Sequence, residues 1–271
     1  MSAQHEVAAG LLAALRREGA LASALPEGIA PATIADGYAI QDRFRALWGQ
    51  PVAGWKIGAT AAAVQAKFGV SEPFAGPFFA PDVYQSPARP PSARFPHHCL
   101  ECEFAFRFSR RVAPRATRYV RDEIGQAIDA VVPAFEIVGP RFDSLLFGRA
   151  PTAIADCGVN AGIVLGKPFA GWRDLDLPGH GVRLRVNGEP RAEGSGANVL
   201  GDPVAVLEWA VNHLSVRGIA IEPGQHISTG TTTGIAYVAP GDNAVADFGA
   251  IGTIEVRFGG PPPAVLVPAP A

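Results

Sequence analysis

Cysteine and charged residues are scarce in this 271-residue sequence, and each shortage limits the kinds of protein that it can encode. Its three cysteines, Cys99, Cys102 and Cys157, form no even disulfide framework, so we expect a reducing compartment and predict a cytoplasmic protein. Charged residues make up only 18% of the chain and the formal net charge is −2, which gives no reason to expect nucleic acid or an anionic membrane as a partner. The sequence has no apolar run long enough to span a bilayer and no secretory signal at its beginning.

Several motifs of well-known catalytic and nucleotide-binding sites are also missing. The chain has no Gly-x-Ser-x-Gly elbow of the kind found in serine hydrolases. The glycines of residues 194–201 have the wrong spacing for a dinucleotide fingerprint, and residues 228–234 lack the Gly-Lys-Ser/Thr of a P-loop. No second Cys/His pair follows Cys99 and Cys102 at the spacing of a zinc finger, so we expect cysteines packed in the core.

Hydrophobic residues are plentiful at 48%, which is typical of a compact globular protein. Apolar periodicity predicts amphipathic helices over about residues 3–18 and 32–48, and the texture then changes to short β-like runs broken by Gly and Pro. We therefore predict an α+β fold with an N-terminal helical region at 1–48, a β-rich domain at 49–258 and an unstructured Pro/Ala-rich tail at 259–271.

Shorter segments carry their own local patterns. Residues 61–68 and 118–131 are expected to be helical, and Asn187-Gly188 between two β-like runs predicts a hairpin. Asp202-Pro203 has the residues of a helix start, with Asp as N-cap and Pro at the first helical position, and Gly218 is a suitable C-terminal stop.

The central feature of the sequence is the strand predicted over residues 100–108. Its side chains alternate, so that Glu101 and Glu103 share the face opposite the apolar one, with Cα atoms about 6.5–7 Å apart. Glu136 lies inside an apolar run, where an unpaired carboxylate is costly. Three such carboxylates favour a hard divalent cation, Mg²⁺ or Mn²⁺. The alternative is that Glu101 and Glu103 are solvated residues on the outer face of an edge strand.

Two further segments have the chemistry of an anion site. Lys56 stands between Gly54 and Gly58, which allow close approach of a ligand, and a confined lysine can stabilise an oxyanion. Its alternative is a surface lysine whose stem packs on the protein while its amine reaches water. The hydroxyls and glycines of residues 228–234 can cradle an anionic group, although a threonine-rich strand end looks the same.

Taken together, these motifs resemble the 2-keto-4-pentenoate hydratase / 4-oxalocrotonate decarboxylase family of the fumarylacetoacetate hydrolase superfamily. The matching segments follow one another along most of the chain: Gly54–Gly58, Gly76–Asp82, Glu101–Phe106, Phe135–Val138, Ile154–Gly166, Leu200–Pro203, Thr229–Asp242 and Phe248-Gly249. The resemblance implies a fumarylacetoacetate hydrolase-like mixed β roll preceded by helices and assembled as a homo-oligomer. It also implies Mg²⁺ or Mn²⁺ held at Glu101, Glu103 and Glu136.

The same resemblance implies an activity. The family's hydratases add water to a 2-hydroxy-2,4-dienoate in aromatic catabolism and form a 4-hydroxy-2-oxo acid, with a small 2-oxo or 2-hydroxydienoic acid as the partner molecule. Lys56 and Asp82 are expected at the reacting end as catalytic residues, Asp82 shuttling protons if burial raises its pKa. Thr229, Gly230 and Thr231 are expected to hold the substrate carboxylate.

Other activities stay open on the same scaffold. They are decarboxylation of a 4-oxalocrotonate-type 2-oxo acid, hydrolysis of an acylpyruvate C–C bond, and a catalytically silent subunit that partners an active paralogue. The sequence departs from the family pattern at Gly139-Pro140, which precede Arg141, and at Cys157 to Asn160, where the family commonly has Asn and then a serine. These departures leave the metal ligands intact and leave the substrate open.

Overall fold

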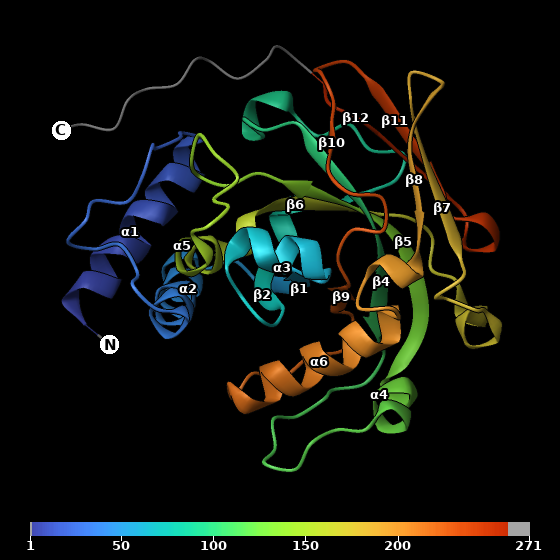
Figure 1. The fold of residues 1–271 in the computed structure, drawn as a ribbon, viewed down its shortest axis with the longest axis horizontal. Coiled ribbons are helices and arrows are strands. Elements are labelled where there is room, and N and C mark those ends of the chain that lie inside the picture. Colours follow the sequence, from blue (N-terminus) through green and yellow to red (C-terminus); the bar gives the residue numbers. More distant parts are fainter. Residues whose placement is uncertain (1, 260–271) are drawn as a thin grey trace.

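A computed structural model describes residues 2–259 of the chain. Two β-sheets form its centre and right-hand side in Figure 1, with α1 and α2 at the opposite end. The tail predicted at 259–271 lies outside the described residues except for Gly259. That residue donates a backbone hydrogen bond to Pro90 and accepts one from Ser92.

The larger sheet carries the predicted Glu-x-Glu strand near its middle. Its strand order is β2-β1-β9-β4-β5-β6-β3, and β10 also pairs with β4. The strands are β1 Val52–Gly58, β2 Phe74–Phe79, β3 Val83–Gln85, β4 Cys99–Phe108, β5 Ile128–Val138, β6 Asn160–Leu165, β9 His226–Ser228 and β10 Ala236–Tyr237. Phe78 of β2 packs with Ile163 and Leu165 of β6 although several strands separate them in the sheet. The sheet therefore curls on itself as a roll.

The smaller sheet is antiparallel, with strand order β12-β11-β7-β8. Its strands are β7 Gly181–Val186, β8 Glu189–Ser195, β11 Asn243–Asp247 and β12 Thr253–Arg257. Leu184 of β7 shares one buried core with Phe104 and Phe106, on the apolar face of β4. The predicted hairpin at Asn187-Gly188 is confirmed, with positive φ values of 54° and 86° at the two turn residues.

The helices lie around these sheets. They are α1 Ala3–Glu18, α2 Ile34–Trp48, α3 Ala62–Phe68, α4 Arg121–Ala127, α5 Ala150–Ala155 and α6 Pro203–Val216. Short 3₁₀ turns are η1 Ala80–Asp82, η2 Ser92–Arg94, η3 Cys157–Val159, η4 Ala170–Asp174, η5 Gly196–Asn198 and η6 Gly249–Ile251. Asp202 caps α6 as predicted, because its side chain accepts a hydrogen bond from the backbone of Val204.

One helix prediction is wrong in its extent. Only Arg121–Ala127 of the predicted helix at 118–131 is helical, and β5 begins at Ile128. The β-branched residues from Ile128 onward pair on one side with β4 and, further along, with β6 on the other. These ladder contacts override the local helical periodicity.

Helices α1 and α2 pack directly on the rest of the molecule. Leu12 of α1 and Phe44 of α2 belong to one apolar cluster with Phe79 of β2 and Ile154 of α5. Val7 of α1, by contrast, is 56% exposed. The N-terminal helices are therefore part of the wall around the larger sheet.

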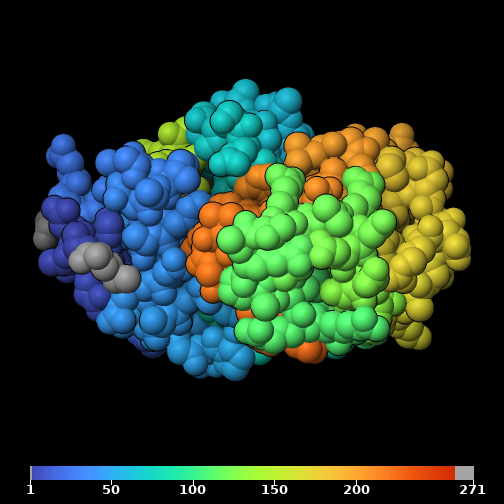
Figure 2. Space-filling view, turned by 90° about the horizontal axis from the view of Figure 1, so that it is seen from below, coloured from blue at the N-terminus to red at the C-terminus, as the bar shows by residue number. Residues whose placement is uncertain are grey.

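The space-filling view shows how these parts share one face of the molecule (Figure 2). The N-terminal helices lie at one end and the region of β7 at the other, with the β4–β5 connection and α6 between them. Among residues 2–259, no helix combines the length and the apolar character that a membrane crossing requires.

Gly76 of β2 packs tightly against the turn at Cys157–Val159, and a substitution there tests this contact. A Cβ built on Gly76 would lie 2.0 Å from the carbonyl oxygen of Cys157, a backbone atom. Gly76→Ala is expected to lower the free energy of unfolding by at least about 2 kcal/mol, because the strand or the turn must shift. Gly10→Ala in α1, where nothing lies within 4 Å, is the control and is expected to raise stability by up to about 1 kcal/mol. Urea unfolding measures both, and an unchanged Gly76→Ala protein would contradict the packing.

Candidate active site

Three carboxylates converge on one face of the larger sheet. Glu101 of β4 lies directly opposite Glu136 of β5 in the antiparallel ladder, and Glu103 is the next residue along the same face of β4. One oxygen from each of the three lies within 4.8 Å of the others. Glu103 and Glu136 are fully buried, so the alternative of solvated residues on an edge strand does not hold for Glu103.

The surroundings of these carboxylates are small and apolar. Ala105, two residues after Glu103, and Ala134, two residues before Glu136, lie on the same face, and Ile163 of β6 lies opposite Glu136. Such neighbours supply no counter-charge, and a buried carboxylate without one is strongly destabilising. The compensating charge must therefore come from elsewhere.

Lys56 of β1 supplies part of it. Its Nζ lies 3.1 Å from Glu136 Oε2 and donates a hydrogen bond of 3.1 Å to the carbonyl oxygen of Gly158. The lysine is only 3% exposed, which contradicts the alternative of a surface lysine whose amine reaches water. One ammonium beside three carboxylates leaves two negative charges, the charge that a divalent cation neutralises.

Two neutral donors fix the orientation of the glutamates. The backbone N–H of Gly230 donates to Glu103 Oε2 at 3.1 Å, and Asn160 Nδ2 donates to Glu136 Oε1 at 3.0 Å. Gly230 has φ of +90°, and a Cβ there would lie 2.1 Å from Thr60 Oγ1, so this position requires glycine.

The remaining carboxylate oxygens show whether a metal ion fits. Within residues 2–259, Glu103 Oε1 and Glu136 Oε2 are buried and accept no hydrogen bond, although Lys56 forms an ion pair with Glu136 Oε2. Buried carboxylate oxygens without donors are costly unless a cation binds them. An all-oxygen set of this kind is what Mg²⁺ and Mn²⁺ prefer, so the residues present fit the expected metal.

The pKa values reflect the same excess of negative charge. Burial, and then the neighbouring charge of Glu136, raises the pKa of Glu101 to about 7. Burial and the two other carboxylates raise the pKa of Glu103 well above its ordinary value. Burial disfavours the Lys56 ammonium, but the three carboxylates outweigh it and raise the pKa of Lys56. Lys56 is therefore charged at neutral pH.

A cavity of about 370 Å³ opens beside this cluster. Its polar wall includes Lys56, Thr60, Glu101, Gly230 and Thr231, and much of its remaining wall is apolar. A bound molecule can therefore contact the lysine and the carboxylate cluster at one end and hydrocarbon at the other.

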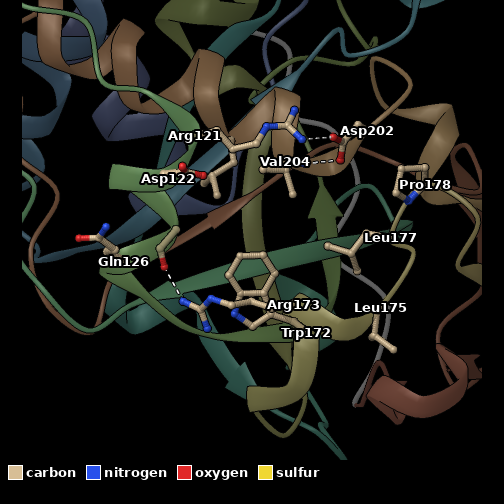
Figure 3. Close-up of a pocket in the computed structure, with 12 residues that line it drawn as sticks. Arg121, Asp122, Gln126, Trp172, Arg173, Leu175, Leu177, Pro178, Asp202 and Val204 are labelled. Carbon is tan, nitrogen blue, oxygen red and sulfur yellow. Dashed lines mark hydrogen bonds and ion pairs between the residues drawn. The ribbon is translucent and has the colours of Figure 1, made fainter.

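A larger depression of about 600 Å³ lies between α4, the turn at Ala170–Asp174 and the start of α6 (Figure 3). Its arginines already have partners: Arg121 pairs with Asp202 at 2.8 Å, and Arg173 donates to the backbone carbonyls of Gly125 and Ile128. Glu101, Glu103 and Glu136 lie elsewhere, so the smaller cavity is the candidate active site.

Of the three residues expected to hold a substrate carboxylate, two line the candidate cavity and one does not. Gly230 and Thr231 line the candidate cavity. Thr229 is fully buried and does not line it, and its hydroxyl donates to the carbonyl oxygen of Phe104. Thr231 Oγ1 donates to the carbonyl oxygen of Gly234.

Asp82 lies apart from Lys56 and the three glutamates. Its carboxylate pairs with Arg16 at 2.8 Å and with Arg94, and it borders a different cavity of about 330 Å³. The resemblance placed Asp82 at the reacting end, but the 3₁₀ turn at Ala80–Asp82 brings it to Arg16, which also donates to the carbonyl oxygen of Ala161 in β6.

Sequence reasoning did not assign a role to three residues that the structure brings to the site. Asn160 orients Glu136, the carbonyl of Gly158 accepts from Lys56, and Thr60 lines the cavity. Asn160 and Gly158 fall in the segment where the sequence departs from the family pattern. That departure was the feature of the sequence that could have pointed to them.

The raised carboxyl pKa values predict how a metal ion changes stability with pH. Glu101 and Glu103 have folded pKa values above the ordinary 4.5, so the metal-free fold loses stability as the pH rises from about 4.5 through 7. A cation such as Mg²⁺ that binds the deprotonated carboxylates would restore that stability. The increase in melting temperature caused by Mg²⁺ is expected to be larger at pH 8 than at pH 6, as measured by differential scanning fluorimetry. Glu103→Gln should remove most of the response, and equal increases at both pH values would contradict the assignment.

Asn160 is expected to matter for metal affinity without binding the metal itself. Removing the donor to Glu136 Oε1 frees that carboxylate to rotate, so Asn160→Ala should weaken Mg²⁺ binding by roughly 10–100-fold. Isothermal titration calorimetry gives the affinity, and circular dichroism checks the fold. A folded variant with unchanged affinity would show that the contact has no role in positioning Glu136.

Comparisons with known proteins agree with this geometry. Residues 68–258 match the family model described as fumarylacetoacetate (FAA) hydrolase C-terminal. The chain is 32% identical over 232 residues to a 4-oxalocrotonate decarboxylase from Pseudomonas putida, covering 83% of this chain and 86% of that protein. It is 31% identical over 258 residues to a 2-keto-4-pentenoate hydratase from Paraburkholderia xenovorans (strain LB400), covering 94% and 95%.

A solved structure has the same overall fold. The 4-oxalocrotonate decarboxylase from Pseudomonas putida G7, complexed with magnesium and adipate, aligns with a TM-score of 0.86 at 26% identity and covers 94% of this chain and 97% of that one. The expected mixed β roll with an N-terminal helical part is thereby confirmed. The chain belongs to the fumarylacetoacetate hydrolase family, in the branch of the 2-keto-4-pentenoate hydratases and 4-oxalocrotonate decarboxylases.

Proposed function

We propose that this protein is a divalent-metal-dependent hydro-lyase that hydrates a 2-hydroxy-2,4-dienoate to a 4-hydroxy-2-oxo acid in aromatic catabolism. The observation that carries the proposal is the buried ammonium of Lys56, held 3.1 Å from Glu136 in a cluster of three carboxylates at the wall of a 370 Å³ cavity. Relatives named as hydratases, including the 2-keto-4-pentenoate hydratase above, support the same reaction.

The cofactor we propose is Mg²⁺ or Mn²⁺, held by Glu101, Glu103 and Glu136. The solved 4-oxalocrotonate decarboxylase contains magnesium in one structure and calcium in another, which supports a divalent cation. When bound, the cation supplies a Lewis acid that stabilises negative charge on the oxygens of a 2-oxo acid.

The protein's own residues then supply binding, charge and a proton. Hydration requires ketonisation of the dienol, in which the 2-hydroxyl loses its proton and C5 gains one. Water then adds at C4, losing one proton while C3 gains one. Negative charge develops on the C2 oxygen in both steps. The Lys56 ammonium, which is buried 3.1 Å from Glu136, stabilises that charge. We propose that Lys56 Nζ also relays protons: it delivers a proton to the substrate carbon and recovers one from the 2-hydroxyl or from the attacking water.

Asp82 does not take part in this scheme. Both of its carboxylate oxygens are bonded to arginines, and it borders another cavity. We therefore propose Lys56 in place of Asp82 as the acid, with Gly230 and Thr231 beside the bound carboxylate.

Decarboxylation of a 4-oxalocrotonate-type acid is the second candidate. It is favoured by the TM-score of 0.86 to a solved 4-oxalocrotonate decarboxylase, and it needs the same stabilisation of charge at C2.

We further propose that the enzyme is a cytoplasmic homo-oligomer. Three buried cysteines without a disulfide are compatible with a reducing compartment, and light scattering tests the assembly.

The proposed reaction has a direct optical test. With Mg²⁺ and 2-hydroxypenta-2,4-dienoate, the purified protein should remove the dienol absorbance and form 4-hydroxy-2-oxopentanoate. Release of carbon dioxide from 4-oxalocrotonate without hydration would support the decarboxylase instead. A metal-loaded protein that is inactive in both assays would overturn both candidates.

Variants connect the activity to the carboxylate cluster. Glu103→Ala should lower Mg²⁺-dependent turnover by about a hundredfold or more while leaving the fold intact, because it removes a charged oxygen ligand. Glu189→Ala, an exposed residue of β8, is the control and should leave turnover unchanged. Unchanged activity in Glu103→Ala would contradict the site.

A further inference from the structure

The candidate cavity is larger than a five-carbon dienoate requires. Its volume is about 370 Å³, and pockets of about 300–1,000 Å³ enclose ligands of drug size. The reacting groups, Lys56 and Glu101, occupy one part of the wall. The remaining space must therefore accept a substituent at the other end of the substrate.

Three aromatic rings lead away from the reacting end. Lys56 Nζ lies 6.0 Å from the ring centroid of Phe74. Phe74 contacts Phe68 edge-on at 5.2 Å between centroids, and Phe68 contacts Phe147 at 5.1 Å. Phe147 is 44% exposed, so the row of rings extends from the buried lysine to the surface of the molecule.

The other side chains along this path are mostly aliphatic. Val64, Leu145 and Ile235 line the same cavity. Besides Lys56, its one cationic lining residue is Lys67, an exposed side chain whose Nζ lies 5.4 Å from the ring centroid of Phe147. A substituent in this part of the cavity contacts hydrocarbon along most of its length.

We infer that the preferred substrate carries an uncharged apolar substituent of several carbons, alkyl or aryl, on C5 of the dienoate. The inference rests on the proposed function, because that function places the 2-oxo acid end of the substrate at Lys56, Gly230 and Thr231. A terminal carboxylate placed against Phe68 and Phe74 would be desolvated beside hydrocarbon, which is unfavourable. Hydrated Lys67, at the exposed end, offers weak compensation.

Three substrates test the preference: 2-hydroxypenta-2,4-dienoate, 2-hydroxyocta-2,4-dienoate and 2-hydroxyocta-2,4-diene-1,8-dioate. Burial of three added methylene-sized groups should raise kcat/KM of the octadienoate at least about tenfold above the pentadienoate, mainly through KM. The diacid should fall at least about tenfold below the octadienoate. A diacid that is the best substrate would overturn the inference.

Variants locate the effect in the cavity. Phe147→Ala should reduce the octadienoate-to-pentadienoate ratio of kcat/KM several-fold, because it removes the outer ring. Val216→Ala, 84% exposed at the end of α6, is the matched control and should leave the ratio unchanged. Lys67→Met should not lower kcat/KM for the diacid, and a selective loss there would show that Lys67 binds a terminal carboxylate.

A binding measurement separates this inference from the proposed reaction. If no dienoate turns over, the proposed function fails, and the apolar preference is then judged with unreactive 2-oxo acids. In the presence of Mg²⁺, calorimetry should show 2-oxooctanoate binding at least about tenfold more tightly than 2-oxooctanedioate. Equal affinity, the reverse order or no binding of either acid would overturn the inference.

Discussion

The convergence of three carboxylates, two of them fully buried, beside a single lysine is the constraint on which the rest of the structure depends. Glu101 and Glu136 are directly opposite each other in the β4–β5 ladder, and a shift of register by one residue would turn either of them to the apolar face. The register is therefore fixed by the long apolar strands on both sides, even though it brings like charges together. Lys56 offsets one charge, and the arrangement is complete only with a cation.

The elements around the cluster hold it from several directions. Asn160 bonds to Glu136 through its side chain, while its backbone carbonyl accepts hydrogen bonds from Arg16 at 3.1 Å and from Arg141 at 2.8 Å. Arg141 is in turn paired with buried Asp156. Because Arg16 belongs to α1, the N-terminal helices reach the carboxylate cluster through this chain of contacts. They therefore contribute to the site as well as to the wall around it.

The local parts of the fold and the carboxylate cluster could be predicted from sequence. Alternation over residues 100–108 identified both the strand and the face that carries Glu101 and Glu103, and the apolar run around Glu136 indicated a buried acid. These signals are local, since a period of two and an acid among apolar residues are visible without the partner strand. The ends of elements that are set by a neighbouring strand were not predicted. At Ile128, for example, strand pairing replaces the expected helix.

The rest of the site depends on contacts between distant segments. Asp82 matched a motif in order along the chain, but that order does not say which residues its side chain contacts. Gly158 reaches Lys56 because Cys157, Gly158 and Val159 have positive φ values of 55°, 66° and 63°. Such a conformation is uncommon for Cys and Val, so the backbone preferences of these residues do not predict it. The aromatic row of the cavity likewise combines rings from α3, β2 and the segment before α5.

The most direct measurement of the central claim is the anomalous scattering of Mn²⁺ in crystals of the protein. One peak is expected, with an oxygen of each of Glu101, Glu103 and Glu136 within roughly 2.0–2.3 Å. A Mn²⁺ ion bound elsewhere, or three carboxylates without an ion at saturating Mn²⁺, would contradict the account.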